Sequence, residues 1–497
     1  MQNLLTSEQM RSTDAFTITN KGISSIELME AAANAFVKAF VKEFPDEDTS
    51  IAVLCGKGNN GADGLAISRL LKEMGYDKLS VYLLDFSEKD TEEYRINLSH
   101  LKDMWLQLIT VKTADQLAEL SDEVLVDAVL GSGLNKPLTG AYLDLAKVVN
   151  GLNCKVVAVD VPTGFPAEGV LNKNSIYIKA ELVICFQRPK INFFFPESAT
   201  ALNRFCVVNI GLDEDYIQKQ ESPYQVISRK SIQQLVKPRK LFTHKGTYGH
   251  ALIIAGQTNT MGAALLAARA CLHSGAGLTT LSTPETGLTA LNTALPEVMF
   301  IARAKLGNAE EIKKFKAVAI GPGLGTDEEG TQLVKTLTRY KIPLVIDADA
   351  LNILAAQKEL LEQLTEGSVL TPHMKEFDHL FGQHDSWWNR LETARIMAKQ
   401  LKCIIVLKNQ YTFIVSRTGK VCINTTGNPA MAQGGMGDTL TGIIVSYIAQ
   451  GYSAEDASVI ACYLHGLSGD ELAKESTSVT ATEVALQIPK SLKGLIR

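Results

Sequence analysis

The sequence lacks the marks of several large classes of protein. Lysine and arginine total 49 against 54 aspartates and glutamates, so the formal net charge is −5 and no bulk basic field is present to bind nucleic acid. The uncharged stretches, such as 276–284, are rich in Gly and Thr and are too short or too polar to span a membrane. We therefore expect neither nucleic acid nor a membrane among the partners of this chain.

The cysteines also lack a pattern. All eight are scattered and none forms a C-x-x-C pair, which disfavours a zinc site and a disulfide framework and favours free, buried thiols. The first residues, MQNLLTSEQMRSTDAF, lack the charged and apolar regions of a signal peptide. A cytoplasmic location is the resulting expectation.

What is present is an ordinary globular composition in a long chain. Hydrophobic residues make up 46% and charged residues 21%, which argues against extended disorder or coiled coil. A chain of 497 residues exceeds the size at which a single core usually stops growing. Two or three domains are expected.

Short β-branched runs alternate with amphipathic stretches along most of the chain, which predicts parallel βαβ units and an α/β fold. Strands are predicted at Ile51–Cys55, Ser80–Asp85, Val124–Val129, Val156–Asp160, Leu182–Phe186 and Cys206–Ile210. A second series is predicted at Ala251–Ala255, Ala317–Ile320, Leu344–Asp347, Val369–Thr371 and Ile404–Lys408. Helices are predicted at Leu65–Met74 and Thr439–Ala449.

The polar stretch 211–239 interrupts this alternation and predicts a domain boundary near 220–228. We find no close internal repeat between the two parts. The sequence therefore predicts two different α/β domains, whose binding sites should lie at the carboxyl ends of their strands.

A glycine-rich loop, GKGNNGADG at 56–64, follows the first predicted strand and opens a helix. Gly56, Gly58 and Gly61 satisfy G-x-G-x-x-G, and Asp85 ends the next predicted strand, about where a ribose-binding acid would stand. A dinucleotide-dependent dehydrogenase and simple turn glycines both fit this spacing. The Asn pair and Asp63 add oxygens suited to a cation, a sugar or an amide.

Two further strand ends carry polar groups. Asp127 leads into the loop 131–137, GSGLNKP, and Asp160 leads into VPTG at 161–164. Asn60, Asp127 and Thr163 offer only hard oxygens, which suit an alkali or alkaline-earth ion better than zinc. Asp160 is the candidate base of this domain.

The run NPAMAQGGMGD at 428–438 is the strongest signal in the chain. Converging backbone amides and a helix start predict an anion hole for a transferring phosphoryl group, with Asp438 placed to take a proton from the attacking hydroxyl. The alternative is a glycine-rich turn in which Asp438 serves as the helix N-cap.

Other loops of the second domain stand at predicted strand ends. These are GPGLG at 321–325, TPH at 371–373 and KNQYT at 408–412. His373 is as compatible with a structural role as with a functional one, and Lys408 with a solvated charge as with a phosphate contact. Asp347 and Asp349 could support Mg²⁺ or cap the following helix.

These motifs together resemble a known family over nearly the whole chain. GNNGADG, DAVLGSGLNKP and DVPTG look like the epimerase half of the bifunctional NAD(P)H-hydrate repair enzymes. GHALIIAG, GPGLG, DADALN, LTPH and NPAMAQGGMGD look like their dehydratase half. The resemblance implies a Rossmann-like three-layer epimerase domain over 1–222 and a ribokinase-like α/β/α dehydratase domain over 228–497.

The implied activity is the repair of NADH or NADPH that has taken up water at the nicotinamide ring. The first domain would interconvert the R and S hydrates, NADHX and NADPHX. The second would dehydrate the S form with Mg²⁺ and ADP, giving AMP and phosphate, whereas eukaryotic relatives use ATP. By resemblance we also expect a homo-oligomer.

The resemblance assigns residues to each site. Potassium would be bound by Asn60, Asp127 and Thr163, and catalysis would rest on Asp160 and Asp438. In the first domain the hydrate would contact Asn59, Asn60, Gly61, Ala62, Asp63, Gly131, Ser132, Gly133, Leu134, Asn135, Lys136, Pro137 and Asp160. In the second domain it would contact Ala263, Gly323, His373 and Asp438. The adenine nucleotide would contact Lys408, Asn409, Gln410, Tyr411, Thr412 and Gly437.

The chain departs from the family pattern in the LTPH turn, where Met374 and Lys375 replace a common Pro-Gly. Ala62 stands where glycine is usual, and Thr163 where serine is also common. Two other functions remain open from the residues alone. One is a small-molecule kinase that uses only the second domain, and the other is a nucleotide-binding scaffold without turnover.

Overall fold

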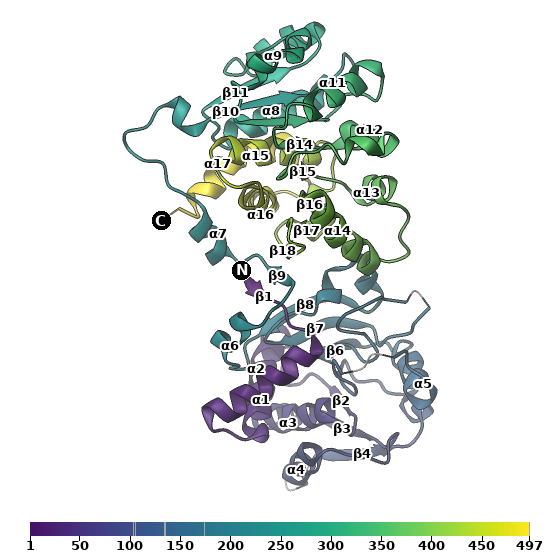
Figure 1. Cartoon of the computed structure of the whole chain (residues 1–497). Helices are drawn as coiled ribbons and strands as arrows, with labels where there is room; N and C mark the ends of the chain where they lie inside the picture. The colour runs from purple at the N-terminus through teal and green to yellow at the C-terminus, as the bar shows by residue number, and fades with distance from the viewer. Residues whose placement is uncertain (103, 105, 134–135, 173, 497) are drawn as a thin grey trace. The chain divides into compact units, whose positions relative to one another are not determined.

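A computed structural model describes residues 1–102, 104, 106–133, 136–172 and 174–496. The chain divides into two compact units. The N-terminal unit comprises Asn3–Ser222 with Ser386–Trp388, and the C-terminal unit comprises Pro223–Asp385 and Asn389–Arg497 with Met1–Gln2. Each unit is an α/β domain built on its own sheet, which confirms the predicted fold class (Figure 1).

The N-terminal sheet has seven strands, and every pair of neighbours is parallel. In sheet order they are β4 (Gln107–Val111), β3 (Leu79–Leu84), β2 (Ile51–Cys55), β5 (Val124–Ala128), β6 (Lys155–Val159), β7 (Ala180–Phe186) and β8 (Leu202–Val208). Its helices are α1 (Ser7–Lys21), α2 (Ser25–Glu43), α3 (Asn59–Glu73), α4 (Glu92–Leu101), α5 (Gly140–Val149) and α6 (Glu214–Lys219).

Helices α2 and α3 pack against one face of this sheet. Every residue of β2 is buried, because the sheet is covered on both faces. Val53 and Cys55 pack into the same cluster as Phe36 of α2 and Leu65 of α3. Since alternate residues of a strand point to opposite faces, α2 and α3 cover this face of the sheet.

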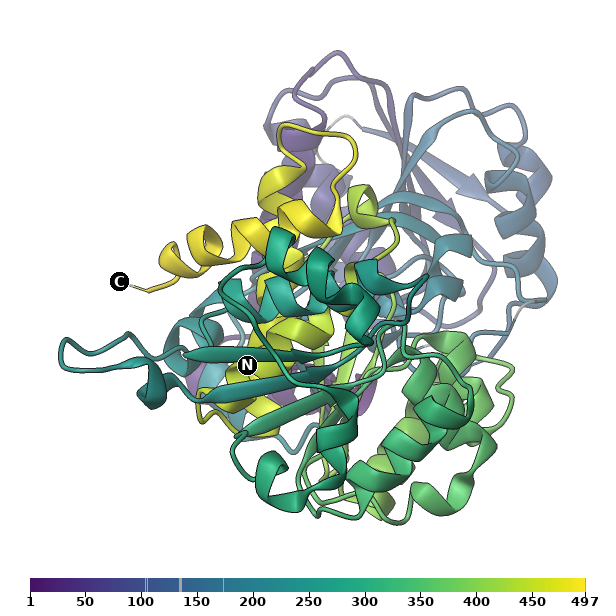
Figure 2. The ribbon, with the colours of Figure 1, turned by 90° about the horizontal axis from the view of Figure 1, so that it is seen from above.

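The C-terminal sheet has eleven strands. In sheet order they are β1 (Gln2–Asn3), β9 (Tyr224–Val226), β18 (Val421–Asn424), β17 (Thr412–Val415), β16 (Ile404–Leu407), β15 (Val369–Leu370), β14 (Leu344–Ile346), β13 (Ala317–Ile320), β10 (His250–Ile254), β11 (Leu278–Ser282) and β12 (Met299–Phe300). From β12 to β16 the neighbours are parallel, and β17 is antiparallel to both β16 and β18. The parallel pair β10 and β11 runs side by side in Figure 2.

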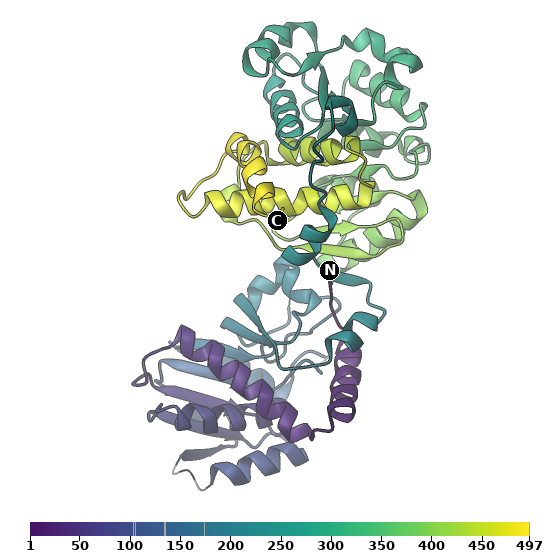
Figure 3. The same ribbon diagram turned by 90° about the vertical axis from the view of Figure 1, so that its left-hand side faces the viewer.

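Helices cover both faces of this sheet, with α15–α17 on one side in Figure 3. They are α7 (Arg229–Leu235), α8 (Met261–His273), α9 (Leu288–Ala294), α10 (Ala309–Ile312), α11 (Glu328–Thr338), α12 (Ala348–Ala356), α13 (Met374–Phe381), α14 (Trp387–Leu401), α15 (Met436–Ala449), α16 (Ala454–Leu472) and α17 (Ala481–Lys493). Gly442 of α15 lies so close to α8 that a Cβ would stand 2.1 Å from the Ala267 carbonyl oxygen. This contact needs glycine, and it brings the two helices together over the core.

The predicted strands are all present, with ends that differ by a few residues. The sequence analysis missed seven further strands, β1, β4, β9, β11, β12, β17 and β18, which supply part of each sheet. β12 and β9 have only two and three residues, and β11 is partly polar, so their sequences carry little strand signal.

All eight cysteines lie in the described part of the chain and are free. Six are buried, whereas Cys154 and Cys206 are only partly buried. Among the described residues, no helix is both long and apolar enough to cross a membrane.

Candidate active sites

A cavity of about 360 Å³ opens at the carboxyl ends of the strands in the N-terminal unit. The predicted site residues in its lining are Asn59, Asn60, Asp63, Gly131, Ser132, Gly133 and Asp160. The sequence analysis did not anticipate the other lining residues, Ser7, Met10, Arg11, Asp14, Phe186, Lys190 and Ile210. Helix α1 and the loop after β7 thus complete a cavity begun by the predicted loops.

Asp160 is the most tightly held acid in this cavity. It follows β6 with a positive φ of 65°, a conformation that is uncommon outside glycine and points to a constrained position. Its Oδ1 lies 2.8 Å from the Nζ of buried Lys190 and accepts a hydrogen bond from the Phe186 amide at 3.1 Å. Burial alone would lower the pKa of Lys190, but the charges of Asp160 and Cys185 raise it above its ordinary value.

Two other carboxyl groups share the cavity and hold their protons more tightly than usual. Burial, followed by the charges of Asp160 and Asp14, raises the pKa of Asp63 well above its ordinary value. Burial and Asp160 raise the pKa of Asp14 to about 6, although Lys190 acts in the opposite direction. The cavity therefore combines an ion-paired carboxylate with two groups able to hold a proton near neutral pH.

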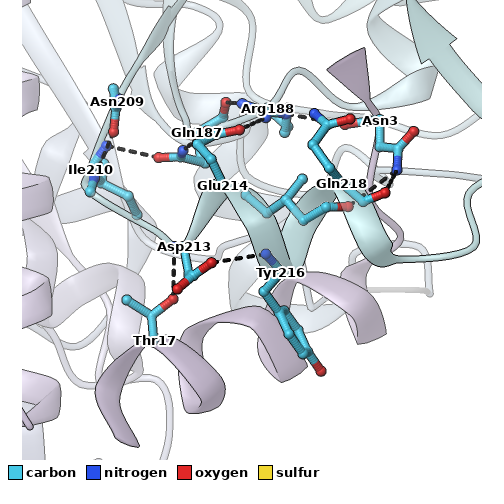
Figure 4. A network of polar contacts seen from close by, with 12 residues as sticks. Asn3, Thr17, Gln187, Arg188, Asn209, Ile210, Asp213, Glu214, Tyr216 and Gln218 are labelled. Atoms are coloured by element: carbon cyan, nitrogen blue, oxygen red, sulfur yellow. Dashed lines mark hydrogen bonds and ion pairs between the residues drawn. The ribbon is translucent and has the colours of Figure 1, made fainter. Parts of the chain in front are cut away.

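A polar network anchors the loop that carries Lys190 (Figure 4). Glu214 forms an ion pair with Arg188 and accepts a hydrogen bond from Gln187 Nε2 at 2.6 Å. Arg188 Nε donates to the Asn3 carbonyl at 3.1 Å, and Gln187 Oε1 accepts from the Ile210 amide at 3.0 Å. The buried guanidinium thus joins the chain start, the loop after β7 and α6.

The glycine-rich loop is shaped by packing. A Cβ on Gly61 would lie 1.6 Å from the Gly56 carbonyl oxygen, and one on Gly56 would lie 2.1 Å from the Val129 carbonyl oxygen. α3 begins at Asn59, so Ala62 lies inside the helix and needs no positive φ. Asp85 forms an ion pair with Lys57 and does not line the cavity, which disfavours the role of ribose-binding acid.

Two of the predicted potassium ligands, Asp127 and Thr163, contact each other at the strand ends. The Oδ1 of Asp127 accepts from the Thr163 hydroxyl at 2.7 Å, and its Oδ2 accepts from the Thr163 amide at 2.7 Å. Burial raises the pKa of Asp127 to about 6 despite these hydrogen bonds. Asn60 is also buried, and its Nδ2 has no hydrogen-bond partner among the described residues.

The other predicted residues of this site lie outside the cavity lining or outside the described chain. Gly61, Ala62, Lys136 and Pro137 do not line the cavity. Leu134 and Asn135 lie outside the described residues.

In the C-terminal unit a cavity of about 480 Å³ lies against the start of α15 and the loop after β16. Lys408, Asn409, Gln410, Thr412 and Gly437 line it as predicted, whereas Tyr411 does not. Pro429, Met431, Leu440 and Cys462 form an apolar part of the wall. A polar end beside an apolar wall suits a nucleotide, with its phosphates and its flat base.

A buried ion pair stands beside this cavity. Lys408 Nζ lies 2.8 Å from Asp347 Oδ1, and the Thr441 hydroxyl donates to Asp347 Oδ2 at 2.7 Å. Burial would raise the pKa of Asp347, but Lys408 and the hydrogen bonds lower it below its ordinary value. A Cβ on Gly437 would lie 3.3 Å from Lys408 Nζ, so the glycine leaves room beside the cation.

Asp438 lies in the first turn of α15. Helix α15 begins earlier than predicted, with Gly435 as its N-cap at φ 90°, so the alternative in which Asp438 caps the helix is wrong. Burial, and then the charge of Asp347, raises the pKa of Asp438 to about 6, while Lys408 opposes this shift. A partly buried carboxylate with this pKa is suited to act as a general base.

Three other predicted contacts surround this region without lining the cavity. His373 caps α13, its Nδ1 accepting from the Lys375 and Glu376 amides at 3.1 and 3.2 Å, so the changed LTPH turn still starts a helix. The Gly323 carbonyl accepts from the Thr260 hydroxyl at 2.7 Å, directly before α8, which carries Ala263. The Oδ2 of Asp349 accepts from the Gly325 amide at 2.8 Å, and the N-cap of α12 is Asp347, so Asp349 does not cap that helix.

Sequence reasoning missed Asp14, Lys190 and His465. Lys190 had a usable signal, because it directly precedes the largely apolar run INFFFP. Asp14 and His465 had none, because each lies inside an amphipathic or apolar helix where a structural role is the ordinary expectation.

Each unit thus has a polar cavity at the carboxyl ends of its strands. The second unit also has a glycine-led helix start, a buried lysine and a basic carboxylate, as a phosphoryl-transfer enzyme requires. Fold and site together define a two-site α/β enzyme.

Comparison with known proteins agrees with this class. A family model described as NAD(P)H-hydrate dehydratase matches residues 251–490, and one described as YjeF-related protein N-terminus matches residues 25–192. The bifunctional NAD(P)H-hydrate repair enzyme of Thermofilum pendens is 32% identical over 491 residues, covering 94% of this chain and 92% of the relative. That of Moorella thermoacetica is 33% identical over 497 residues, covering 95% and 93%.

Among solved structures, a ribokinase-like superfamily protein from Enterococcus faecalis V583 is 29% identical with a TM-score of 0.51. The match covers 56% of this chain and 98% of that chain. The present chain belongs to the family of bifunctional NAD(P)H-hydrate repair enzymes, which combine an epimerase with a dehydratase, as its motifs indicated.

Proposed function

We propose that this protein repairs hydrated NADH and NADPH, with the epimerase in the N-terminal unit and the ADP-dependent dehydratase in the C-terminal unit. The observation that carries the proposal is the pair of cavities in one chain of this family. One cavity holds the Asp160–Lys190 pair, and the other lies beside Lys408, Gly437 and Asp438. The domain limits we assign are 1–222 and 228–497.

The epimerase needs reversible loss and return of the ring hydroxyl. The ring nitrogen supplies the electron pair that expels the hydroxyl as water once it gains a proton, and water then adds to the other face. Asp63 and Asp14 can supply that proton because their pKa values are raised. Asp160, which lies in an ion pair with Lys190, takes the proton from the returning water.

Potassium would be held by Asn60, Asp127 and Thr163. The donor set fits, because Asp127 is a fully buried carboxylate and no described cationic side chain forms an ion pair with it. The unpartnered amide end of Asn60 supports the same assignment, since the rotated amide would direct Oδ1 at the ion. Such an ion would hold the loops after β5 and β6 together.

The dehydratase converts a poor leaving group into a good one. Asp438 takes the proton of the hydrate hydroxyl, the oxygen bonds to the terminal phosphorus of ADP, and the bond to the bridging oxygen breaks to release AMP. The amides around Gly437 and the charge of Lys408 stabilise the transferring group. The ring nitrogen then expels phosphate, and loss of a proton from the neighbouring ring carbon restores the double bond, which leaves NADH or NADPH.

Magnesium would neutralise charge on the nucleotide phosphates. Both oxygens of Asp347 are occupied by Lys408 and Thr441, so Asp347 is a poor direct ligand. Asp349 fits better as an oxygen ligand, directly or through water, and leaves Asp438 free to act as the base.

Two further assignments are part of this proposal. The protein works in the cytoplasm, where NADH and NADPH are used. It forms a homo-oligomer, which would cover the almost fully exposed Leu241 and Phe242. Light scattering of the purified protein tests the oligomer, and a monomer at all concentrations contradicts it.

The test of the activity is recovery of nicotinamide absorbance from a mixture of R and S NADH hydrate with Mg²⁺ and K⁺. Complete recovery that depends on ADP, faster than spontaneous epimerisation, is expected. If NADH is recovered with ATP but not with ADP, the phosphoryl donor is ATP. If it is recovered with neither nucleotide, a small-molecule kinase is favoured. Omitting K⁺ should slow only the epimerase.

A further inference from the structure

His465 of α16 lies in the wall of the C-terminal cavity and has no place in the mechanism above. Its Nε2 is buried and has no hydrogen-bond partner among the described residues. A buried polar atom left unpaired is costly, so it calls for a ligand or another explanation.

The position of His465 is set by its neighbours. The Thr426 hydroxyl donates to the Tyr463 carbonyl at 2.9 Å, and Asn424 Nδ2 donates to the Cys462 carbonyl at 3.2 Å. A Cβ on Gly466 would lie 2.4 Å from the Thr426 carbonyl oxygen. These contacts hold this turn of α16 against the loop after β18 and so fix the backbone position of His465.

The other ring nitrogen is already engaged. The ring forms a hydrogen bond to the Met436 backbone that favours its charged form, so the ring N–H donates to the carbonyl. Because Nε2 has no partner, the donor is Nδ1. Burial, and then the charge of Lys408, nevertheless lower the pKa of His465 to about 4. In the neutral ring Nε2 is therefore a hydrogen-bond acceptor, and its missing partner must be a donor.

We propose that His465 selects the base of the nucleotide, its Nε2 accepting a hydrogen bond from the 6-amino group of adenine. This inference rests on the proposed nucleotide site. The apolar wall of Met431, Leu440 and Cys462 suits a flat base, and Cys462 lies one helical turn from His465. Hypoxanthine and guanine carry a carbonyl oxygen at the same position, which would face the lone pair of Nε2 and repel it.

The experiment is calorimetric titration of the full-length protein and its His465→Phe variant with ADP and with inosine diphosphate, each with Mg²⁺. The wild type should bind ADP roughly ten times more tightly than inosine diphosphate, the scale of one hydrogen bond to a buried acceptor. In His465→Phe this ratio should fall close to one. The variant should retain the wild-type circular dichroism spectrum.

Cys462→Ala is the matched control, because Cys462 lines the same cavity from the same helix. This variant should bind ADP and inosine diphosphate more weakly by the same factor, so that the ratio of the two affinities keeps its wild-type value. A ratio that survives in His465→Phe would overturn the proposal, and so would its loss in Cys462→Ala. The ratio of the affinities for ADP and 2′-deoxy-ADP is a further check. If this ratio changes in His465→Phe, Nε2 accepts from the ribose hydroxyl, and the assignment to the base is overturned.

The failures can be told apart. If the wild type binds neither nucleotide, the proposed nucleotide site itself is wrong. If ADP binds and supports NADH recovery while the ratio is unaffected by His465, only the present inference fails.

Discussion

At the scale of single residues, the two units use carboxyl groups in different electrostatic settings. Asp160 is paired with a buried lysine, whereas Asp438 is partly buried beside the like charge of Asp347. The first setting pairs the carboxyl group with a cation, and the second helps to raise the pKa of Asp438. Substitutions at these positions should therefore separate the two activities.

Replacing Asp160 by Asn should abolish epimerisation and leave dehydration of the S hydrate unchanged. The charged partner of Lys190 would be lost, together with the base. Chromatographic separation of the R and S forms measures the first activity, and absorbance recovery from pure S hydrate measures the second. Asp85→Asn is the control, because Asp85 is exposed, forms an ion pair with Lys57 and does not line the cavity. An unchanged epimerase rate in Asp160→Asn would remove Asp160 from the mechanism.

The dehydratase should lose activity as the pH falls through about 6, because Asp438 must be ionised to accept a proton and burial raises its pKa to about 6. Asp347→Asn removes a like charge, so the acid limb should move to lower pH even though the rate falls. Single-turnover rates from pH 5 to 8 measure this limb. A limb that stays in place in Asp347→Asn would contradict the assignment of Asp438 as the base.

At the scale of elements, the close approach of α15 and α8 positions the helix start that carries Gly437 and Asp438. Gly442 makes that approach possible, since a Cβ would stand 2.1 Å from the Ala267 carbonyl oxygen. Helix packing and the active site are therefore linked in this unit.

Gly442→Ala should lower the free energy of unfolding of the C-terminal unit by about 1–3 kcal/mol, the usual cost of overpacking. Gly262→Ala in α8 is the control, because its Cβ would meet no atom within 4 Å. The control should be neutral or stabilising by about 0.5–1 kcal/mol, since alanine is the better helix former. Urea denaturation of both variants measures the difference, and equal stabilities would contradict the packing argument.

The network around Arg188 should matter to the N-terminal unit alone. Glu214→Gln leaves a buried guanidinium without its carboxylate, which should cost about 1–2 kcal/mol and slow epimerisation severalfold by loosening the loop of Lys190. Dehydration should not change. Asp144→Asn, which alters an exposed ion pair with Lys147, should affect neither activity nor stability. An unaffected epimerase in Glu214→Gln would show that the loop is held by other contacts.

At the scale of the whole molecule, the chain joins two sites that we expect to exchange substrate through solution. Asp160→Asn alone should stall after the S hydrate is consumed, and Asp438→Asn alone should recover no NADH. A mixture of the two variants should recover NADH completely, at close to the wild-type rate when each is present at the wild-type concentration. Absorbance traces of the mixture measure this, and a persistent stall would indicate direct transfer between sites of one chain.

Much of this protein could be read from local sequence. Runs such as IAVLC at 51–55 are buried on both faces in a parallel sheet, so their residue types identify the strands. The loops that follow these strands were found because glycines, asparagines and aspartates gather there. Motif positions such as Asn59, Asp160 and Lys408 line the two cavities.

Tertiary structure alone decided which other side chains join them. Asp14 and Lys190 are distant in sequence from the GNNGADG loop, and only the packing of α1 and the anchored loop after β7 brings them into the cavity. The sequence also did not predict the pKa of each carboxyl group, because a pKa depends on burial and on charges from other elements. The residue types determined the strands and the strand-end loops because those signals are local, whereas the cavities and their proton affinities depend on contacts across the fold.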